Sequence, residues 1–235
     1  PISTILNTRG SCVSISDTSG DLLFYSAYDP SVGISGTDPV KVYNKSHSLM
    51  VNGDSVKGGG WYQELIIVPA PQTDSLFYLF NIGVTFDNGL YYSMIDISQN
   101  SGMGEVIQKN IQLQTFRCTD GLTAIKHGNG RDWWILVKRS DTNNNEFYKY
   151  LVTPNGISNI IIQNIGFSTS NGFTSMHFSP DGTKMILINL AGLMEHYDFD
   201  RCTGILSNPI IIHPQPITAP YGRFWGCEFS ESGRF

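Results

Sequence analysis

Charged residues are scarce in this sequence. They make up 15% of the 235 residues, against roughly 25% in an average soluble domain. The formal net charge is −5, and the few Lys and Arg residues form no cluster, which excludes a basic surface for nucleic acid. No apolar run approaches the ~18 residues needed to cross a bilayer. We therefore expect neither nucleic acid binding nor membrane insertion.

Sequence motifs for metal binding and catalysis are missing as well. None of the four cysteines lies in a CxxC pattern, and the five histidines show no HExxH spacing. There is no GxSxG and no P-loop. His127 and His177 lie on expected strands next to turns, where we expect a histidine that is hydrogen-bonded within its sheet. We expect no cofactor, no metal and no catalytic residue.

One group of acidic residues is close enough in the sequence to be considered as a catalytic set. Glu195, Asp198 and Asp200 fall within the segment EHYDFD. A glycosidase needs two carboxylates that converge on one bond about 5–10 Å apart. These three lie on a single expected strand, so they are not expected to converge. Asp17, Glu64 and Glu228 are the acids of the expected inner strands, and they are too sparse to suggest a matched set.

Gly, Ser, Thr and Asn fill the polar positions, which favours a β-rich chain with many turns. The clearest local signal is FSPDGTKMILIN at residues 178–189. It predicts a strand, a tight turn and a second strand, because Gly182 can take the positive φ that a short hairpin needs. No segment shows a capped helical pattern.

Hairpins of this kind recur along the chain. Their turns centre on Gly20, Asp74, Gly130, Gly182 and Gly233, with separations of 54, 56, 52 and 51 residues. A near-constant period in this range indicates a repeat architecture. Further strands follow each hairpin, with expected third strands at 40–46, 90–97, 147–153 and 193–199 and expected fourth strands at 105–113, 157–166, 204–212 and, more weakly, 49–53.

Four antiparallel strands in every 50–56 residues form the blade of a β-propeller. We expect an all-β, WD40-like propeller segment with blades near 12–60, 61–115, 116–168 and 169–218 and the start of another at 219–235. Because only one strand of the fifth repeat is present, we expect the propeller to be incomplete in this chain and the chain to be the N-terminal part of a longer protein. A β-sandwich is the structural alternative, although it does not predict this period.

Several segments together resemble a known family. They include SCVSISDTSGDLLFYSAY, QELIIVPAPQTDSLFYLF, FSPDGTKMILIN, YDFDRCTGILSNP and GCEFSESGRF. They are similar to the propeller-like regions near the N-termini of large secreted proteins of Bacteroidetes, which commonly end in a gliding-motility-associated sorting domain read by the type IX secretion system. The resemblance covers nearly the whole chain.

The resemblance implies a secreted or cell-surface location more than an activity. It suggests a non-catalytic adhesion or binding propeller, whose partners would be a surface glycan or protein and components of the secretion machinery. Two alternatives remain: a carbohydrate-active glycosidase or lyase built on a propeller, and a structural scaffold carried by a secretion or motility machine.

An extracellular destination would also favour covalent modification. The four cysteines allow two disulfides with three connectivities, and we expect the pairs Cys202–Cys227 and Cys12–Cys118. Exported Bacteroidetes proteins are often O-glycosylated at Asp-Ser or Asp-Thr before an apolar residue. Ser55 and Ser75 fit that pattern.

Aromatic residues before the expected inner strands are candidates for ligand contact. Trp61, Tyr62 and Trp225 lie in such segments. Flat aromatic faces bind apolar surfaces of sugars or peptides at little entropic cost. We expect these three residues to form any binding platform.

Overall fold

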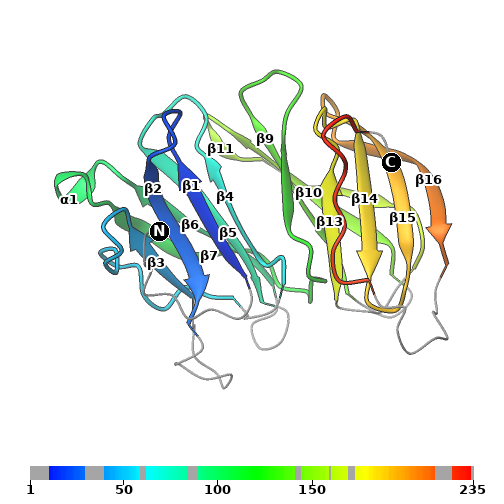
Figure 1. The fold of residues 1–235 in the computed structure, drawn as a ribbon, viewed down its shortest axis with the longest axis horizontal. Coiled ribbons are helices and arrows are strands. Elements are labelled where there is room, and N and C mark those ends of the chain that lie inside the picture. Colours follow the sequence, from blue (N-terminus) through cyan, green and yellow to red (C-terminus); the bar gives the residue numbers. More distant parts are fainter. Residues whose placement is uncertain are drawn as a thin grey trace. The chain divides into compact units, whose positions relative to one another are not determined.

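The computed structural model describes residues 11–29, 40–58, 62–83, 89–140, 144–158, 160–168, 173–214 and 224–233. These residues form antiparallel β-sheets, and helix is nearly absent from them (Figure 1). The chain divides into two compact units, Pro1–Phe116 and Arg117–Phe235, and each unit holds two sheets. The expected all-β class is confirmed.

The first unit contains a three-stranded and a four-stranded sheet. The first sheet has the order β1-β2-β3, with strands β1 (Cys12–Ser16), β2 (Leu22–Tyr28) and β3 (Val40–Asn44). The second has the order β4-β5-β6-β7, with strands β4 (Leu65–Pro69), β5 (Leu76–Gly83), β6 (Gly89–Asp96) and β7 (Glu105–Gln114). Every strand pairs with the next along the chain, so both sheets are meanders.

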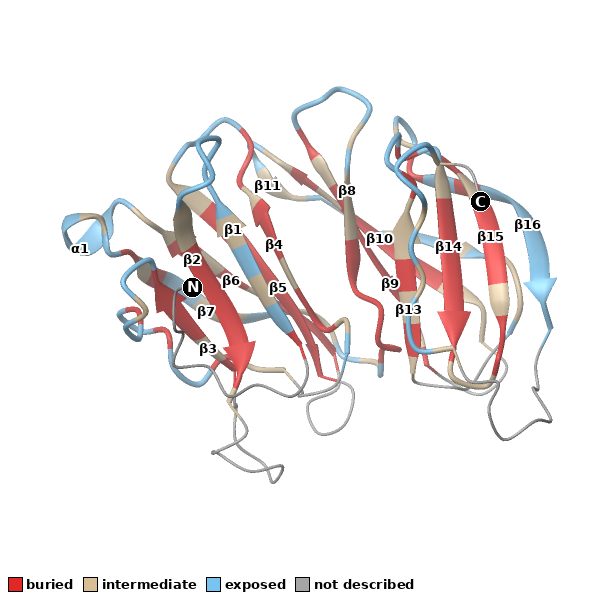
Figure 2. Cartoon of the chain, viewed as in Figure 1, coloured by how far each residue is buried: buried red, intermediate tan, exposed pale blue. Residues whose placement is uncertain are grey.

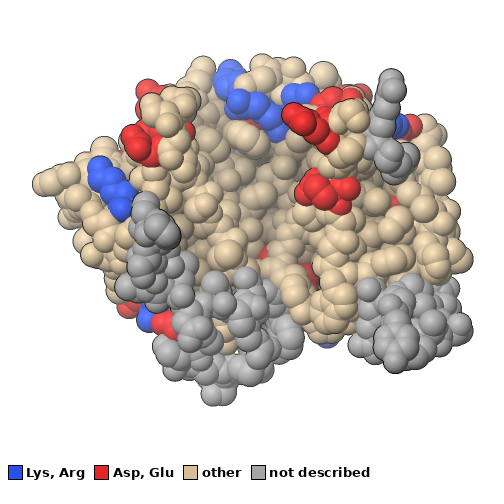
Figure 3. Space-filling view, viewed as in Figure 1, with Lys and Arg blue, Asp and Glu red and all other residues tan. Residues whose placement is uncertain are grey.

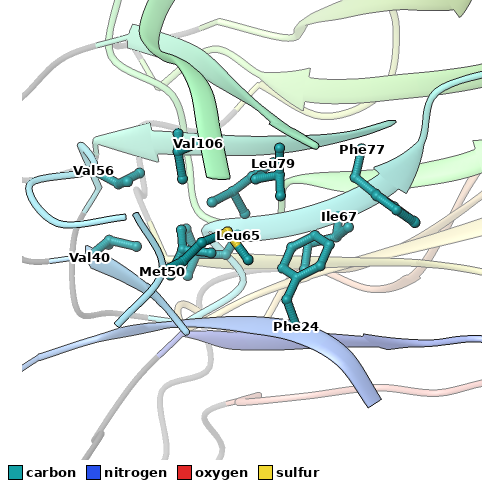
Figure 4. Close-up of a cluster of buried hydrophobic side chains, with 11 residues drawn as sticks. Phe24, Val40, Met50, Val56, Leu65, Ile67, Phe77, Leu79 and Val106 are labelled. Carbon is teal, nitrogen blue, oxygen red and sulfur yellow. The ribbon is translucent and has the colours of Figure 1, made fainter. Parts of the chain in front are cut away.

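Apolar side chains from the facing sides of these two sheets form the core of the first unit (Figure 4). Phe24 of β2 meets Phe77 of β5 edge to face, with ring centroids 5.3 Å apart. Val40, Leu79 and Val106 are fully buried beside them. Packing of the two sheets requires β-branched and aromatic residues on one face of each strand. Side chains alternate between the faces along a strand, and the sequence shows the matching alternation of apolar and polar residues.

The second unit repeats this arrangement. One sheet has the order β11-β10-β9-β8, with β12 also paired to β10; its strands are β8 (Thr123–Lys126), β9 (Trp133–Lys138), β10 (Glu146–Thr153), β11 (Gly156–Ile157) and β12 (Ile161–Asn164). The other has the order β13-β14-β15-β16, with strands β13 (Thr174–Phe178), β14 (Lys184–Asn189), β15 (Met194–Asp200) and β16 (Ile205–His213).

Burial decreases from the middle strands to the last strand of a sheet. β14 is buried along most of its length, whereas β16 is exposed at all but one position (Figure 2). In the core of the second unit, Trp134 and Phe147 of one sheet pack with Leu187 and Tyr197 of the other. The Phe147 and Tyr197 rings meet edge to face at 5.6 Å.

Residues about one repeat apart meet within each unit. In the first unit, the backbone N–H of Glu64 donates to Oγ of Ser11, 53 residues earlier. In the second, Oγ1 of Thr174 donates to Oγ1 of Thr119, 55 residues earlier, over 2.9 Å. Each bond links the beginning of one repeat to the beginning of the next. Segments about one period apart in the sequence are therefore in contact in the structure.

The hairpin of residues 178–189 forms as expected, with β13 paired to β14. Asp181 fixes its turn by accepting hydrogen bonds from the Ser179 hydroxyl at 2.6 Å and from the Thr183 backbone N–H at 3.0 Å. These bonds favour the carboxylate and lower the pKa of Asp181 to about 2. Gly182 takes the expected positive φ of 70°.

Two expected fourth strands differ in the structure. Residues 49–53 form no strand; Leu49 and Val51 make only isolated bridges, to Tyr43 and to Glu105 of β7. The expected strand at 157–166 is split into β11 and β12. The single turn α1 (Gln99–Gly102) falls at an expected turn, and its Asn100 and Ser101 have positive φ.

The expected disulfides are not found, because none of Cys12, Cys118, Cys202 and Cys227 forms a disulfide in the structure. Cys202 lies in the β15–β16 turn and touches Gly128 of the neighbouring sheet. Cys227 precedes Glu228, which contacts His177 on the opposite face of the β13–β16 sheet. The two cysteines thus lie near different partners, Cys202 beside Gly128 and Cys227 next to the residue that contacts His177. Cys12 and Cys118 belong to different units.

Gly204 offers a test of the packing between turns in the second unit. A Cβ at Gly204 would meet the Trp134 ring at 2.9 Å, and the Trp134 indole N–H is held by the Arg201 carbonyl. Gly130 has a similar φ of 73° but open space around it. We expect Gly130→Ala to cost about 1–2 kcal/mol through backbone strain and Gly204→Ala about 1–3 kcal/mol more through overpacking. Urea unfolding of both variants measures this difference; equal costs would contradict it.

Candidate functional site

Ser175 and His177 lie two residues apart on strand β13 and therefore share one face of the sheet. Their neighbours Met176 and Thr174 are buried, and Met176 belongs to the core between the two sheets of this unit. Ser175 and His177 consequently face away from that core. Ser175 Oγ lies 2.9 Å from Nε2 of His177.

The C-terminal segment, residues 224–233, brings a carboxylate to the other side of the same imidazole. Oε2 of Glu228 lies 3.3 Å from Nδ1 of His177. The hydroxyl, the imidazole and the carboxylate thus form a continuous chain, with one group at each ring nitrogen. We call Ser175, His177 and Glu228 the Ser-His-Glu cluster.

The repeat explains why Glu228 reaches His177. The two residues are 51 residues apart, the same spacing as the turn glycines Gly182 and Gly233. Glu228 therefore occupies the position of His177 in the next repeat. The structure shows that these equivalent positions are in contact; from the sequence, Glu228 was only one of a few scattered acids and Ser175 was not a candidate.

The geometry assigns a role to each nitrogen of His177. When Nδ1 carries the ring proton, it donates to Glu228, and Nε2 is left to accept the proton of the Ser175 hydroxyl. This is the arrangement in which a carboxylate orients a histidine that acts as the base for a serine. The His177 side chain is 30% exposed and that of Glu228 is 71% exposed, so solvent reaches the cluster.

An apolar wall flanks the cluster on the same sheet face. Ser175 pairs with Ile188 and His177 with Ile186, and both isoleucines are buried. His196 follows Ile186 across the sheet and is buried as well. Burial, together with the positive charge of Lys184, lowers the pKa of His196, which favours its neutral form.

The acids of β15 do not converge, as expected from the sequence. Glu195 faces the core, where it accepts bonds from the Phe167 N–H at 3.1 Å and the Tyr197 hydroxyl at 2.5 Å. Asp198 faces the opposite side and pairs with Lys184 at 3.0 Å. Asp200 accepts from the Cys202 N–H in the following turn. Each carboxylate is occupied by local structure.

His127 is likewise committed to a turn. Its Nδ1 accepts a hydrogen bond from the Asn129 backbone N–H at 2.9 Å, and its Nε2 lies 3.0 Å from the Cys202 carbonyl. Both nitrogens are therefore used to join two turns of the second unit. His127 is hydrogen-bonded, as expected, but one of its two partners belongs to the neighbouring sheet rather than to its own.

The expected aromatic platform is only partly described. Trp61 lies outside the described residues. Tyr62 is 42% exposed in the first unit and Trp225 is 57% exposed in the second. Ser55 is exposed and Ser75 is half-buried, and glycosylation at either stays a prediction.

Other site types find no support in the part of the chain that the structure covers. Its His, Cys, Asp and Glu residues form no group of three or more that could hold a metal ion. A search for a helix of membrane-spanning length and hydropathy found none in the same residues. On the face in Figure 3, acidic and basic side chains occupy small separate groups.

Two of the solved structures that are similar to this chain share little sequence with it. The first is described as "a putative 6-phosphogluconolactonase" from Bacteroides uniformis, with 11% identity over 93% of this chain and a TM-score of 0.48. The chain spans 60% of that structure. The second, with the same description, is from Bacteroides fragilis; it has 12% identity over 94% of this chain and 74% of its own, and a TM-score of 0.36. No protein-family model and no curated protein matches.

These findings correct two expectations from the sequence. Both similar structures are described as enzymes, which contradicts the expected non-catalytic adhesion protein and the expected absence of an enzyme. We do not retain either. Identities of 11–12% assign no reaction to this chain, so its chemistry has to be argued from its own residues.

Proposed function

We propose that this chain is a serine hydrolase that cleaves an ester or a lactone, which is a cyclic ester. The observation that carries the proposal is the Ser-His-Glu cluster, with Ser175 Oγ 2.9 Å and Glu228 Oε2 3.3 Å from opposite nitrogens of His177. A hydroxyl alone is a weak nucleophile at neutral pH, and an adjacent base activates it.

Each residue has a defined task in this mechanism. Ser175 Oγ attacks the carbonyl carbon of the ester while its proton moves to Nε2 of His177. That proton then passes to the departing alkoxide as the C–O bond breaks, leaving an acyl group on Ser175. Water attacks the acyl carbonyl, gives a proton to Nε2 and releases the acid, and His177 returns the proton to Ser175. Glu228 stabilises the imidazolium during both halves.

The surroundings favour a particular kind of substrate. Ile186 and Ile188 give the cluster an apolar flank, and Trp225 lies three residues before Glu228 on the same segment. An exposed aromatic face on the segment that carries Glu228 suits a substrate with an apolar face, such as a sugar ring. We therefore assign uncharged esters or sugar lactones as the first substrates to test.

The proposal places the site on a β-propeller. Each sheet would be one blade, and the contacts between residues one repeat apart, Ser11 to Glu64 and Thr119 to Thr174, support packing of consecutive blades within each unit. The Ser-His-Glu cluster would then lie between the fourth blade and the first strand of a fifth. Export by the type IX system to the cell surface, and a glycan or protein partner there, stay predictions, which fractionation of the source cells would test.

Covalent labelling tests the nucleophile directly. A fluorophosphonate reacts with a serine only where a neighbouring base activates the hydroxyl, so we expect one adduct, on Ser175, by mass spectrometry of peptides. His177→Gln should abolish the adduct, whereas Ser207→Ala, at an exposed serine of β16, should leave it unchanged. An unlabelled Ser175 in the folded protein would refute the proposal.

A further inference from the structure

A pocket of about 280 Å³ lies on the first unit, against the β1–β2 hairpin and the turn after β3. Its walls are mostly apolar and include Val13, Leu22 and the ring of Tyr25, with Cys12, Ser14 and His47 as polar members. Small-molecule sites typically measure about 300–1,000 Å³ and have mostly apolar walls with a few polar groups. The pocket volume is just below that range.

Strand register places Cys12, Ser14 and Tyr25 on the face of the three-stranded sheet opposite to the core, whereas Val13 packs against the core with Ile15. Ser14 pairs with Tyr25 and therefore shares its face, whereas Ile15 pairs with Phe24, which belongs to the core. Cys12 is on the same side as Ser14 because side chains alternate along a strand. Cys12 and Ser14 are exposed. The pocket is thus separate from the buried core.

His47 is held over this pocket in a costly backbone conformation. Its φ is 61°, in the left-handed region that glycine enters freely and other residues rarely do. Asn44 fixes the turn: its Oδ1 accepts the N–H groups of Ser46 at 2.9 Å and Ser48 at 3.1 Å, and its carbonyl accepts the N–H of His47. Strain that the surroundings enforce is most common at ligand sites.

His47 and Tyr25 form an aromatic pair with one polar link. Their ring centroids are 5.7 Å apart, and Tyr25 also stacks on Tyr43 at 5.2 Å. Nδ1 of His47 lies 3.3 Å from the Tyr25 hydroxyl. When Tyr25 donates its proton to Nδ1, the oxygen keeps lone pairs for a donor from a ligand. Burial raises the pKa of Tyr25, which favours the protonated hydroxyl.

We propose that this pocket binds a small uncharged aromatic compound that carries a hydroxyl group, of the phenol class. The described lining contains no Lys, Arg, Asp or Glu, so a charged ligand would lose its hydration without gaining a partner. The aromatic ring of the ligand packs on the Tyr25 and His47 rings. Its hydroxyl donates to the Tyr25 oxygen. The site does not depend on the proposed hydrolase, which uses residues of the other unit.

The exposed thiol of Cys12 reports on occupancy. With p-cresol as the probe, we expect alkylation of Cys12 by iodoacetamide to slow at least five-fold at saturation, followed by mass spectrometry of the peptides. Alkylation of Cys202, an exposed thiol of the second unit, should not change. Cyclohexanol, which lacks the ring, and benzoate, which is charged, should protect Cys12 much less.

Variants separate this site from a general effect of phenols. Ser14→Phe, at an exposed strand position that tolerates an aromatic residue, should fill the pocket and abolish protection, and Tyr25→Phe should weaken p-cresol binding about ten-fold. Ser175→Ala should bind p-cresol normally. Equal protection of Cys12 and Cys202, equal protection by benzoate, or no protection by p-cresol in the folded protein would each overturn the proposal.

Discussion

Replacing Ser175 by alanine is expected to lower kcat/KM for a p-nitrophenyl ester or a gluconolactone by a factor of about 10³ or more. The variant lacks the only oxygen that can form the acyl intermediate of the proposed mechanism, and loss of a triad nucleophile removes most of the rate enhancement. Stability should change little, because Ser175 is half-buried and outside the core. Release of p-nitrophenol, or of acid from the lactone, measures the rates.

Substitutions of the other two cluster residues are expected to lower kcat/KM by different amounts. His177→Gln removes the base and is expected to match Ser175→Ala, while the double variant should be no worse than either, because the residues act as one unit. Glu228→Gln should cost only about ten-fold, since the Glu228 carboxylate is 71% exposed and water screens it. Ser207→Ala is the control with wild-type rate. Full activity in Ser175→Ala would contradict the mechanism.

Replacing Lys149 by methionine is expected to raise the free energy of unfolding by about 2–3 kcal/mol at neutral pH. Lys149 is fully buried between the sheets of the second unit, where its Nζ bonds to Oε1 of Gln163 at 2.5 Å. Burial lowers its pKa from 10.5 to about 8, and each pKa unit corresponds to about 1.4 kcal/mol. Gln163 Oε1 keeps the Leu206 N–H as a partner, so methionine leaves no orphaned group there.

The stabilisation by methionine should depend on pH in a defined direction. Between pH 8 and 10.5 the unfolded chain retains a proton on Lys149 that the native state has released. Wild-type stability therefore rises with pH across this window relative to the variant. The advantage of methionine should be largest below pH 8 and shrink above it.

Urea unfolding of both proteins from pH 6 to pH 10.5 measures this dependence. Lys184→Met is the matched control. Lys184 forms an ion pair with Asp198, its side chain is 44% exposed, and exposed ion pairs contribute little to the free energy of unfolding. A pH-independent difference between Lys149→Met and the wild type would show that the Lys149 amine is not desolvated in the native state.

Much of the fold was readable because its causes are local. The hairpin turns need glycine at positive φ, as at Gly182, and the strands need alternating apolar residues, so both features leave direct marks in the sequence. The fourth strand expected at 49–53 in the first repeat does not form. That segment makes only isolated β-bridges, to β3 and to β7. That choice between partners depends on contacts that no local pattern encodes.

The candidate site was predicted less well, for a different reason. The aromatic platform was chosen from residue type and position alone, and Trp61 falls outside the described residues. His177 was noticed, but its partners were not, since a Ser two residues before a His is common in any strand. The disulfides failed because spacing along the chain does not reveal which face of a sheet a cysteine occupies.

The sequence by itself determined the repeating antiparallel strands, their turns and the low charge of the chain, because these follow from the preferences of single residues and short periods. Only the tertiary structure decided that Ser175 and Glu228 contact the two ring nitrogens of His177 and that the four cysteines form no disulfide. Those outcomes depend on which faces pack together, and packing is set by the whole set of facing side chains.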